Sequence, residues 1–289
     1  MSFPGFGHPP ALYFIWILPR NLFSRICGWY AELRIPHFLL HPLIGLFCLI
    51  YKVDLSESER PLEGFDSFNA FFTRKLKPGL RPLAPEKDAV LSPVDGTLGE
   101  FGEIRKERLI QSKGLDYRLE DLLLDPGRAV IYDEGLFITL YLAPHNYHRI
   151  HSMVDGEVFE FAYIPGDLWT VSPLGLKQVT GLFARNERIV TYLETEYGEC
   201  ALVKVGATVV GKIRVKYHQQ VTNLRGGKKR FVKLDRPWQV KRGEEIGLFE
   251  LGSSVICLFS KGQVESADLQ TGKPVLFGQS LGRFVNQQT

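Results

Sequence analysis

Short apolar runs separated by Gly and Pro occupy the chain from residue 56 onward, and this pattern restricts the fold more than any other feature. The runs are too short for typical helices and rich in β-branched and aromatic side chains, which predicts strands. Two short helices are expected among them, at 67–72 behind an N-cap at Asp66 or Ser67, and at 119–124. We therefore predict an α+β domain over residues 56–289, built mainly of antiparallel strands. The predicted strands are 129–132, 136–142, 189–193, 201–205, 212–217 and 254–259.

The first 55 residues have a different character and are predicted to form a separate helical region. Their apolar runs, at 11–18 and 43–51, are bounded by Pro, Arg and His. Neither run approaches the ~20 apolar residues that a membrane-spanning helix needs, so no spanning helix is expected. A removed signal peptide is a poor fit as well, because no small-residue cleavage site follows a clean apolar core.

An amphipathic helix is expected between these two runs, over residues 21–34. Its apolar side chains recur at helical spacing and are flanked by arginines. Such a helix can lie in the plane of a membrane, or it can pack on the protein's own core. Three consecutive apolar elements favour the membrane, so we predict that residues 1–55 associate with a bilayer. The apolar edge consists of Leu22, Ile26, Trp29 and Leu33, and the flanking arginines are Arg20, Arg25 and Arg34.

The charge and the cysteines exclude several classes of protein. The chain has 35 basic and 32 acidic residues, a net charge of +3. This excess is too small for a dedicated nucleic-acid binder, which must neutralise many phosphates, so no nucleic-acid partner is expected. The four cysteines are widely spaced without a CxxC pair, which argues against a zinc site or a disulfide framework.

Three of the seven histidines, His145, His148 and His151, are concentrated in the segment PHNYHRIH. Their spacing is compatible with metal ligands along one helical edge, but no nearby cysteine or HExxH pattern supports this, and we predict no metal. They can also simply cap or line the surface. General acid–base chemistry is the third interpretation, because the pKa of an imidazole is near ~6.5.

Two further segments have features of turns. Asp95 lies in the sequence SPVDG, and Gly252, Ser253 and Ser254 lie in ELGSSVI near the C-terminus. Taken alone, the first is an ordinary Asx-type turn and the second a β-turn or bulge between strands. Neither segment indicates a function by itself.

Together, however, the SPVDG, YHRIH and LGSS segments resemble the pyruvoyl-dependent phosphatidylserine decarboxylases of bacterial and mitochondrial membranes. One departure is Ser254, where the usual LGST motif of that family has threonine; the hydroxyl is retained, and alignment on Gly252 makes Ser253 the reacting residue. The resemblance extends from residue 61 onward. It also includes FNAFFTR at 68–74, LIQSKG at 109–114 with Tyr117, PG at 165–166, FARNER at 183–188, VGA at 205–207 and GEEIG at 243–247.

This resemblance implies a self-cleaving proenzyme. The Ser253 hydroxyl would attack the Gly252 carbonyl, and elimination and hydrolysis would leave a pyruvoyl group in place of Ser253. Gly252 has no Cβ and leaves the carbonyl accessible. The products would be a β chain, residues 1–252, and an α chain, residues 253–289, that begins with the pyruvoyl cofactor.

The resemblance also implies roles for three other residues. Asp95 and His151 would form a relay with Ser253 in the manner of a Ser-His-Asp triad. The pyruvoyl group would serve as the electron sink for decarboxylation of phosphatidylserine to phosphatidylethanolamine. His148 would place the substrate carboxylate or protonate the carbanion.

The implied partners are phosphatidylserine in the membrane and the chain's own two fragments, associated as a heterodimer, with a homodimer of these left open. The implied location is the cytoplasmic side of the cell membrane, held peripherally. Two alternatives stay open at this point. A pyruvoyl decarboxylase of a soluble amino acid would not need residues 11–51, and a non-enzymatic β module would remain an intact 32.8 kDa chain.

Overall fold

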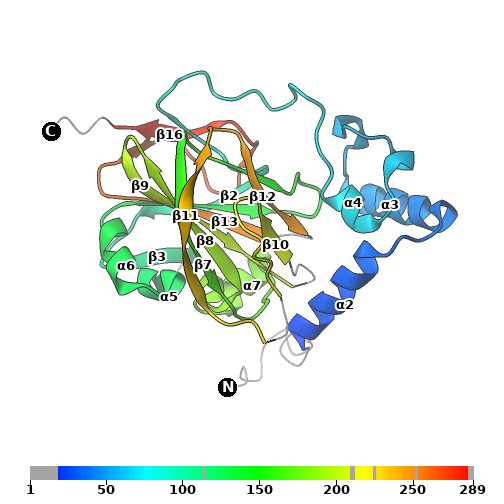
Figure 1. The fold of residues 1–289 in the computed structure, drawn as a ribbon, viewed down its shortest axis with the longest axis horizontal. Helices are drawn as coiled ribbons and strands as arrows, with labels where there is room; N and C mark the ends of the chain where they lie inside the picture. Colours follow the sequence, from blue (N-terminus) through cyan, green and yellow to red (C-terminus); the bar gives the residue numbers. More distant parts are fainter. Residues whose placement is uncertain (1–18, 113–114, 209–211, 224–225, 251–252, 286–289) are drawn as a thin grey trace.

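The computed structural model describes residues 19–112, 115–208, 212–223, 226–250 and 253–285 (Figure 1). The apolar run 11–18 and Gly252 lie outside these ranges. An antiparallel sheet of eight strands forms the centre of the molecule, in the order β11-β7-β8-β9-β13-β5-β2-β15. Its strands are β2 (Gly96–Glu103), β5 (Leu136–Leu142), β7 (Gly156–Ile164), β8 (Arg188–Thr195), β9 (Gly198–Val205), β11 (Arg230–Val240), β13 (Ser253–Phe259) and β15 (Pro274–Val275).

Three smaller antiparallel sheets accompany it. Their orders are β10-β12-β6, β1-β16-β14 and β3-β4. The predicted α+β class with mainly antiparallel strands is therefore confirmed. The strands are β1 (Ala89–Leu91), β3 (Arg108–Ser112), β4 (Leu115–Arg118), β6 (Arg149–His151), β10 (Lys212–Val215), β12 (Glu245–Glu250), β14 (Val264–Ser266) and β16 (Ser280–Phe284).

The large sheet has an apolar core on each face because side chains alternate along every strand. Ile138 and Val255 contribute to the cluster on the side of the two three-stranded sheets. Phe137 and Ile256 contribute to the cluster on the opposite side, where four short helices pack. These helices are α5 (Leu119–Leu123), α6 (Pro126–Tyr132), α7 (Pro173–Gln178) and α8 (Leu182–Arg185).

One predicted strand, 129–132, is wrong: these residues form the end of helix α6. Asp125 caps this helix, its side chain accepting a hydrogen bond from the Arg128 amide at 3.1 Å, and Pro126 occupies the first turn. An Asp-Pro pair is a strong helix start, and it outweighs the β propensity of the following Val and Ile. By contrast, the predicted helix near 67–72 is confirmed as α4 (Phe68–Phe72), with Ser67 as its N-cap.

The N-terminal helices lie beside the β body (Figure 1). They are α2 (Arg20–Glu32) and α3 (His37–Tyr51), followed by the short 3-10 turns η1 (Leu55–Glu57) and η2 (Leu62–Gly64). Leu40 and Ile44 of α3 are fully buried in a third apolar cluster with phenylalanines of the segment 65–72. In the described ranges no helix is long and apolar enough to cross a membrane.

Helix α2 exposes its apolar edge. Leu22, Ile26 and Trp29 are 49%, 45% and 57% exposed, whereas Ser24 and Ala31 are buried against the body. A helix that packed on its own core would turn the large apolar side chains inward. The large apolar side chains of α2 are therefore exposed rather than packed on the core in the part of the chain that the structure describes.

Candidate active site

His151 lies at the end of β6, where the SPVDG segment passes beside it. The His151 amide donates a hydrogen bond to the carbonyl of Pro93 at 2.9 Å, which fixes this contact. The ring stacks on Phe277 with centroids 3.7 Å apart. Its Nδ1 lies 2.8 Å from the Gly243 carbonyl oxygen and its Nε2 3.1 Å from the Tyr147 hydroxyl. Both ring nitrogens are thus engaged.

The state of the His151 ring follows from these contacts. Burial lowers its pKa to about 4, so the imidazole is neutral at physiological pH. A carbonyl oxygen can only accept, so Nδ1 carries the proton and Nε2 keeps its lone pair. A neutral imidazole that keeps a lone pair on Nε2 is the form that a general base requires.

Asp95 is buried close to this ring but is held by other groups. The Arg81 guanidinium donates to both carboxylate oxygens, at 3.2 Å for Nε–Oδ1 and 2.8 Å for Nη2–Oδ2. The amide of Phe277, whose ring stacks on His151, donates to Oδ1 at 2.8 Å. Within the described residues no hydrogen bond joins Asp95 to His151. Phe277 contacts both residues, with its amide on Asp95 and its ring on His151. The predicted relay of Asp95, His151 and Ser253 stays a prediction.

Ser253 is the first residue of β13, between β5 and β9 in the large sheet. It lies opposite Leu142 of β5, while Ser254 lies opposite Val205 of β9. Both serines are buried, and neither hydroxyl has a hydrogen-bond partner in the described part of the chain. A buried hydroxyl without a partner costs free energy and calls for a functional explanation.

The two serines face opposite sides of the sheet. Ser253 shares the face of Val255, whose cluster includes Ile150 of the histidine strand. Ser254 shares the face of Ile256, whose cluster is formed with helices α5–α8. The alternation thus directs Ser253, and not Ser254, toward the side of the sheet that carries β6.

His148 precedes β6 and is completely buried. Its Nδ1 lies 2.8 Å from the Asn146 carbonyl oxygen, and Nε2 has no partner in the described part of the chain. Phe72 covers the ring, with centroids 4.2 Å apart. Burial lowers the pKa of His148 to about 3, so this ring is also neutral.

Strand β12 runs along the histidine segment, pairing with β6. The Phe249 amide donates to the His148 carbonyl at 2.9 Å, and Ser253, the first residue of β13, pairs with Leu142 of β5. His145, in contrast, is exposed, so the three histidines do not form a single edge.

Several residues of this site escaped the sequence analysis. Arg81 and Phe277 carry no motif signal, because their contacts with Asp95 and His151 come from segments far apart in the chain. Tyr147 lies inside the histidine segment, and an aromatic hydroxyl four residues before His151 was a usable but weak signal.

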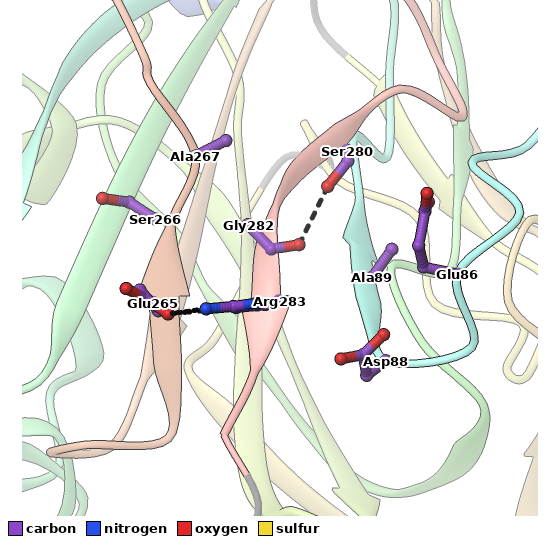
Figure 2. A pocket seen from close by; sticks show the side chains of 9 residues that line it. All are labelled: Glu86, Asp88, Ala89, Glu265, Ser266, Ala267, Ser280, Gly282 and Arg283. Carbon is purple, nitrogen blue, oxygen red and sulfur yellow. Dashed lines mark hydrogen bonds and ion pairs between the residues drawn. The ribbon is translucent and has the colours of Figure 1, made fainter.

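Cavity size alone does not locate this site. A cavity of about 390 Å³ lies at the β1-β16-β14 sheet, where Arg283 and Glu265 form an ion pair at 2.7 Å (Figure 2). It is lined by none of the predicted site residues. A smaller cavity of about 220 Å³ lies under α2, between Trp29, Asn69 and Glu250. Glu250 precedes Ser253 by three residues in the sequence.

Comparison with known proteins shows the family to which the chain belongs. A family model for phosphatidylserine decarboxylase matches residues 68–283. The chain is 44% identical over 269 residues to the phosphatidylserine decarboxylase proenzyme of Anaeromyxobacter sp. (strain K), covering 92% of this chain and 95% of that protein. The proenzymes of Brevibacillus brevis and Coxiella burnetii (strain RSA 331 / Henzerling II) are 40% and 42% identical, covering 91% and 92% of this chain and 94% and 95% of their own lengths. The chain belongs to the phosphatidylserine decarboxylase family, which confirms the resemblance seen in the sequence.

Proposed function

We propose that this chain is a proenzyme that cleaves itself between Gly252 and Ser253 and then decarboxylates phosphatidylserine to phosphatidylethanolamine. Family membership over most of the chain supports the reaction. The observation that carries the assignment of residues is the buried, unpartnered hydroxyl of Ser253, at the start of a central strand and on the face of the histidine strand.

Cleavage begins when the Ser253 Oγ attacks the Gly252 carbonyl carbon. The C–O ester bond forms as the C–N peptide bond breaks, and the proton of the hydroxyl passes to the freed amine. Elimination of the ester across Cα–Cβ of residue 253 releases the Gly252 carboxylate and leaves dehydroalanine. Water then displaces ammonia, which converts this residue to the pyruvoyl group.

His151 would act as the base for these steps, with Asp95 supporting it electrostatically. Nε2 has the lone pair that can accept the Ser253 proton, and Nδ1 is fixed by the Gly243 carbonyl. The Tyr147 hydroxyl occupies Nε2 in this structure, so it must move aside or pass the proton on. Asp95, anchored by Arg81, adds a nearby negative charge that favours the imidazolium form.

The pyruvoyl group would supply an electron sink for the electron pair released as the substrate carboxylate leaves as CO₂. His148 fits the proton transfers of this reaction. Because the Nδ1–H group donates to the Asn146 carbonyl, Nε2 keeps its lone pair. This buried Nε2 has no hydrogen-bond partner in the described part of the chain. It would take a proton from the ammonium group of the substrate and return it to the carbon that loses CO₂.

The two product chains would stay together as a heterodimer. Residues 253–289 supply β13, which has hydrogen-bonded neighbours on both sides, and also β14, β15 and β16. All seven residues of β13 are buried. Removing this chain would open the large sheet at its centre and expose both apolar clusters, so separation would cost much of the stability of the fold.

Attachment to the cytoplasmic side of the cell membrane would be peripheral, through α2 and α3. Both helices carry exposed large apolar side chains, among them Trp29, Leu46 and Leu49. Helix α2 also lines the cavity whose wall includes Glu250. A phospholipid headgroup could therefore enter from the bilayer while the acyl chains remain in it.

The decisive experiment is intact-mass analysis of freshly purified protein under denaturing conditions. We expect two chains, residues 1–252 and residues 253–289, the second beginning with a pyruvoyl group. Ser253→Ala should remain one inactive chain, whereas the matched control Ser254→Ala should still cleave. A single 32.8 kDa chain in the wild type, or a break after Ser253, would contradict the proposal. Release of CO₂ from phosphatidylserine but not from free serine separates it from a soluble amino-acid decarboxylase.

A further inference from the structure

Arg74, at the end of the FNAFFTR segment, is a buried cation that forms no ion pair with any residue that the structure describes. It is 5% exposed, and its Nη2 donates to the His145 carbonyl at 3.0 Å. Its Nε and Nη1 have no hydrogen-bond partner, and no carboxylate among the described residues lies within ion-pair distance. Buried charges are normally paired, and an unpaired guanidinium in the interior is costly. A buried guanidinium in this state is suited to bind an anion from outside the chain.

A cavity of about 200 Å³ lies against Arg74, and its wall is predominantly cationic. Arg60 and Lys75, both exposed, line it together with Arg149, which is neutralised by Glu245 at 2.9 Å. The single carboxylate of the wall is Glu59. Ser58 and Thr73 add hydroxyl groups. The Thr73 hydroxyl already donates to the Asn69 carbonyl. The unpartnered Nε and Nη1 of Arg74, two further cations and the Ser58 hydroxyl form a chemical environment suited to a phosphate group.

The charges that line the cavity under α2 differ from those that line the cavity at Arg74, although residues of α4 contribute to both walls. There Lys212 forms ion pairs with Glu32 and Glu250. The Lys212 charge is thus already compensated within the protein. Arg25, the other cation of this cavity, is only half-buried, whereas Arg74 is a buried cation without an ion pair among the described residues.

The position of Arg74 indicates which phosphate would bind. Helix α3 exposes Leu46 and Leu49 on its outer face and buries Ile44 against Phe71 and Phe72. Phe72 contacts His148 on its other side. Arg74, two residues after Phe72, donates to the His145 carbonyl. The pKa of His145 is lowered mainly by burial and also by the Arg74 charge. Arg74 therefore lies between the proposed membrane face and the candidate catalytic histidines.

In a serine phospholipid the phosphate also lies between the acyl chains and the reacting serine. We propose that Arg74, assisted by Arg60 and Lys75, binds the phosphodiester of the substrate headgroup and so sets the depth to which the serine moiety enters the site. This assignment rests on the proposed decarboxylation of phosphatidylserine. Free inorganic phosphate has the same chemistry and should compete for the same groups.

The test uses the self-cleaved protein and a water-soluble, short-chain phosphatidylserine. Arg74→Gln should raise KM by about ten- to a hundredfold with kcat little changed, because it removes binding shared by ground state and transition state. The cleaved fraction should equal that of wild type. Arg74→Lys keeps the charge but loses the planar set of N–H donors, so its KM should lie between those of the wild type and Arg74→Gln. Arg105→Gln, an exposed arginine that lines none of these cavities, is the matched control and should change nothing.

Inorganic phosphate distinguishes this assignment from recognition of the substrate carboxylate. Phosphate should inhibit the wild type competitively against the lipid, and its inhibition constant should rise at least about tenfold in Arg74→Gln. Non-competitive inhibition would mean that the cavity binds free phosphate only and would overturn the assignment. Equal inhibition of wild type and variant, or a loss of kcat at unchanged KM, would also overturn it.

Two further results keep the test decisive. If Arg74→Gln fails to fold or cleave, the double variant Arg60→Gln/Lys75→Gln removes only exposed cations of the same wall and should raise KM about three- to tenfold. An unchanged KM in that variant would overturn the proposal. If the wild type itself releases no CO₂ from phosphatidylserine, the proposed function fails; if the wild type is active and all variants match it, only the anion site fails.

Discussion

Helix α2 and strand β13 both carry large apolar residues, but these residues are exposed in α2 and buried in β13. All seven residues of β13 are buried, including its two serines. In α2 the buried residues are Arg20, Ser24 and Ala31, and the large apolar side chains face outward. The apolar content of a segment therefore indicates that it has a surface to bury. It does not indicate whether the protein's own core or another molecule covers that surface.

The reason is that α2 docks on the β body through polar groups. Asn21 donates to the Gly166 carbonyl at 2.9 Å, and the Arg20 guanidinium lies 3.6 Å from the centroid of the Trp169 ring. Glu32 at the other end pairs with Lys212. These contacts hold both ends of the helix while its apolar edge stays available for a bilayer. Helix α3 is intermediate, with Ile44 inside and Leu46 outside.

The largest expected effect tests whether all of the chemistry resides in the β body. His151→Ala and Asp95→Asn should accumulate uncleaved proenzyme, because cleavage needs a base and a nearby anion. His148→Ala should still cleave appreciably but decarboxylate poorly, because it serves the second reaction only. Denaturing electrophoresis measures cleavage and CO₂ release measures turnover. Equal loss of cleavage in both histidine variants would show that their roles are not separate.

The next effect concerns the outer edge of α2. Trp29→Glu with Leu22→Glu should abolish flotation with anionic vesicles and leave cleavage intact, because both residues are exposed. Activity on bilayer substrate should fall far more than activity on a short-chain analogue. The control, Glu63→Gln, removes an exposed charge away from α2 and should leave flotation unchanged. Loss of cleavage in the double Glu variant would instead place this edge in the core. Deletion of residues 1–51 is a poorer test, because it would also remove Ile44 from the cluster that covers His148.

A smaller effect sharpens the comparison within one helix. Ile44→Ala should lower the free energy of unfolding by about 2–4 kcal/mol, since it leaves a cavity beside Phe71 and Phe72. Leu46→Ala, at an exposed site, should change it by less than about 0.5 kcal/mol but weaken vesicle binding. Denaturant titration and flotation of both variants measure the two quantities. The opposite pattern would mean that α3 is turned the other way in solution.

The last effect is a pH dependence of stability from the buried histidines. Burial depresses the pKa of His148 to about 3 and that of His151 to about 4, below the unfolded value of about 6.5. The stabilisation is therefore complete above pH ~6.5 and is lost as pH falls, by about 1.4 kcal/mol per pH unit and per histidine. Replacing His148 by Gln should reduce this slope between pH 6.5 and 4. His37→Gln, at an exposed position, should leave it unchanged, and identical slopes in all three proteins would contradict the burial of His148.

Much of the fold was predictable from local pattern. The strand at 254–259 and the helix near 67–72 were predicted correctly because alternation and an N-cap serine act over a few residues. The strand at 129–132 was wrong because Asp125 and Pro126 start a helix, a signal that lies outside the apolar run itself. The site residues were predicted from resemblance, since no spacing links Asp95, His151 and Ser253.

The sequence by itself determined the family, the β-rich class and the existence of a helix near 21–34, which the structure has at Arg20–Glu32, because motifs, alternation and helical period are local properties of the chain. Only the tertiary structure decided that this helix turns its apolar edge outward, that Asp95 pairs with Arg81, and that Ser253 faces the histidine strand. Periodicity fixes which side chains share a face. Which face is buried, and which charges meet, depends on segments that are distant in the chain and come together only when it folds.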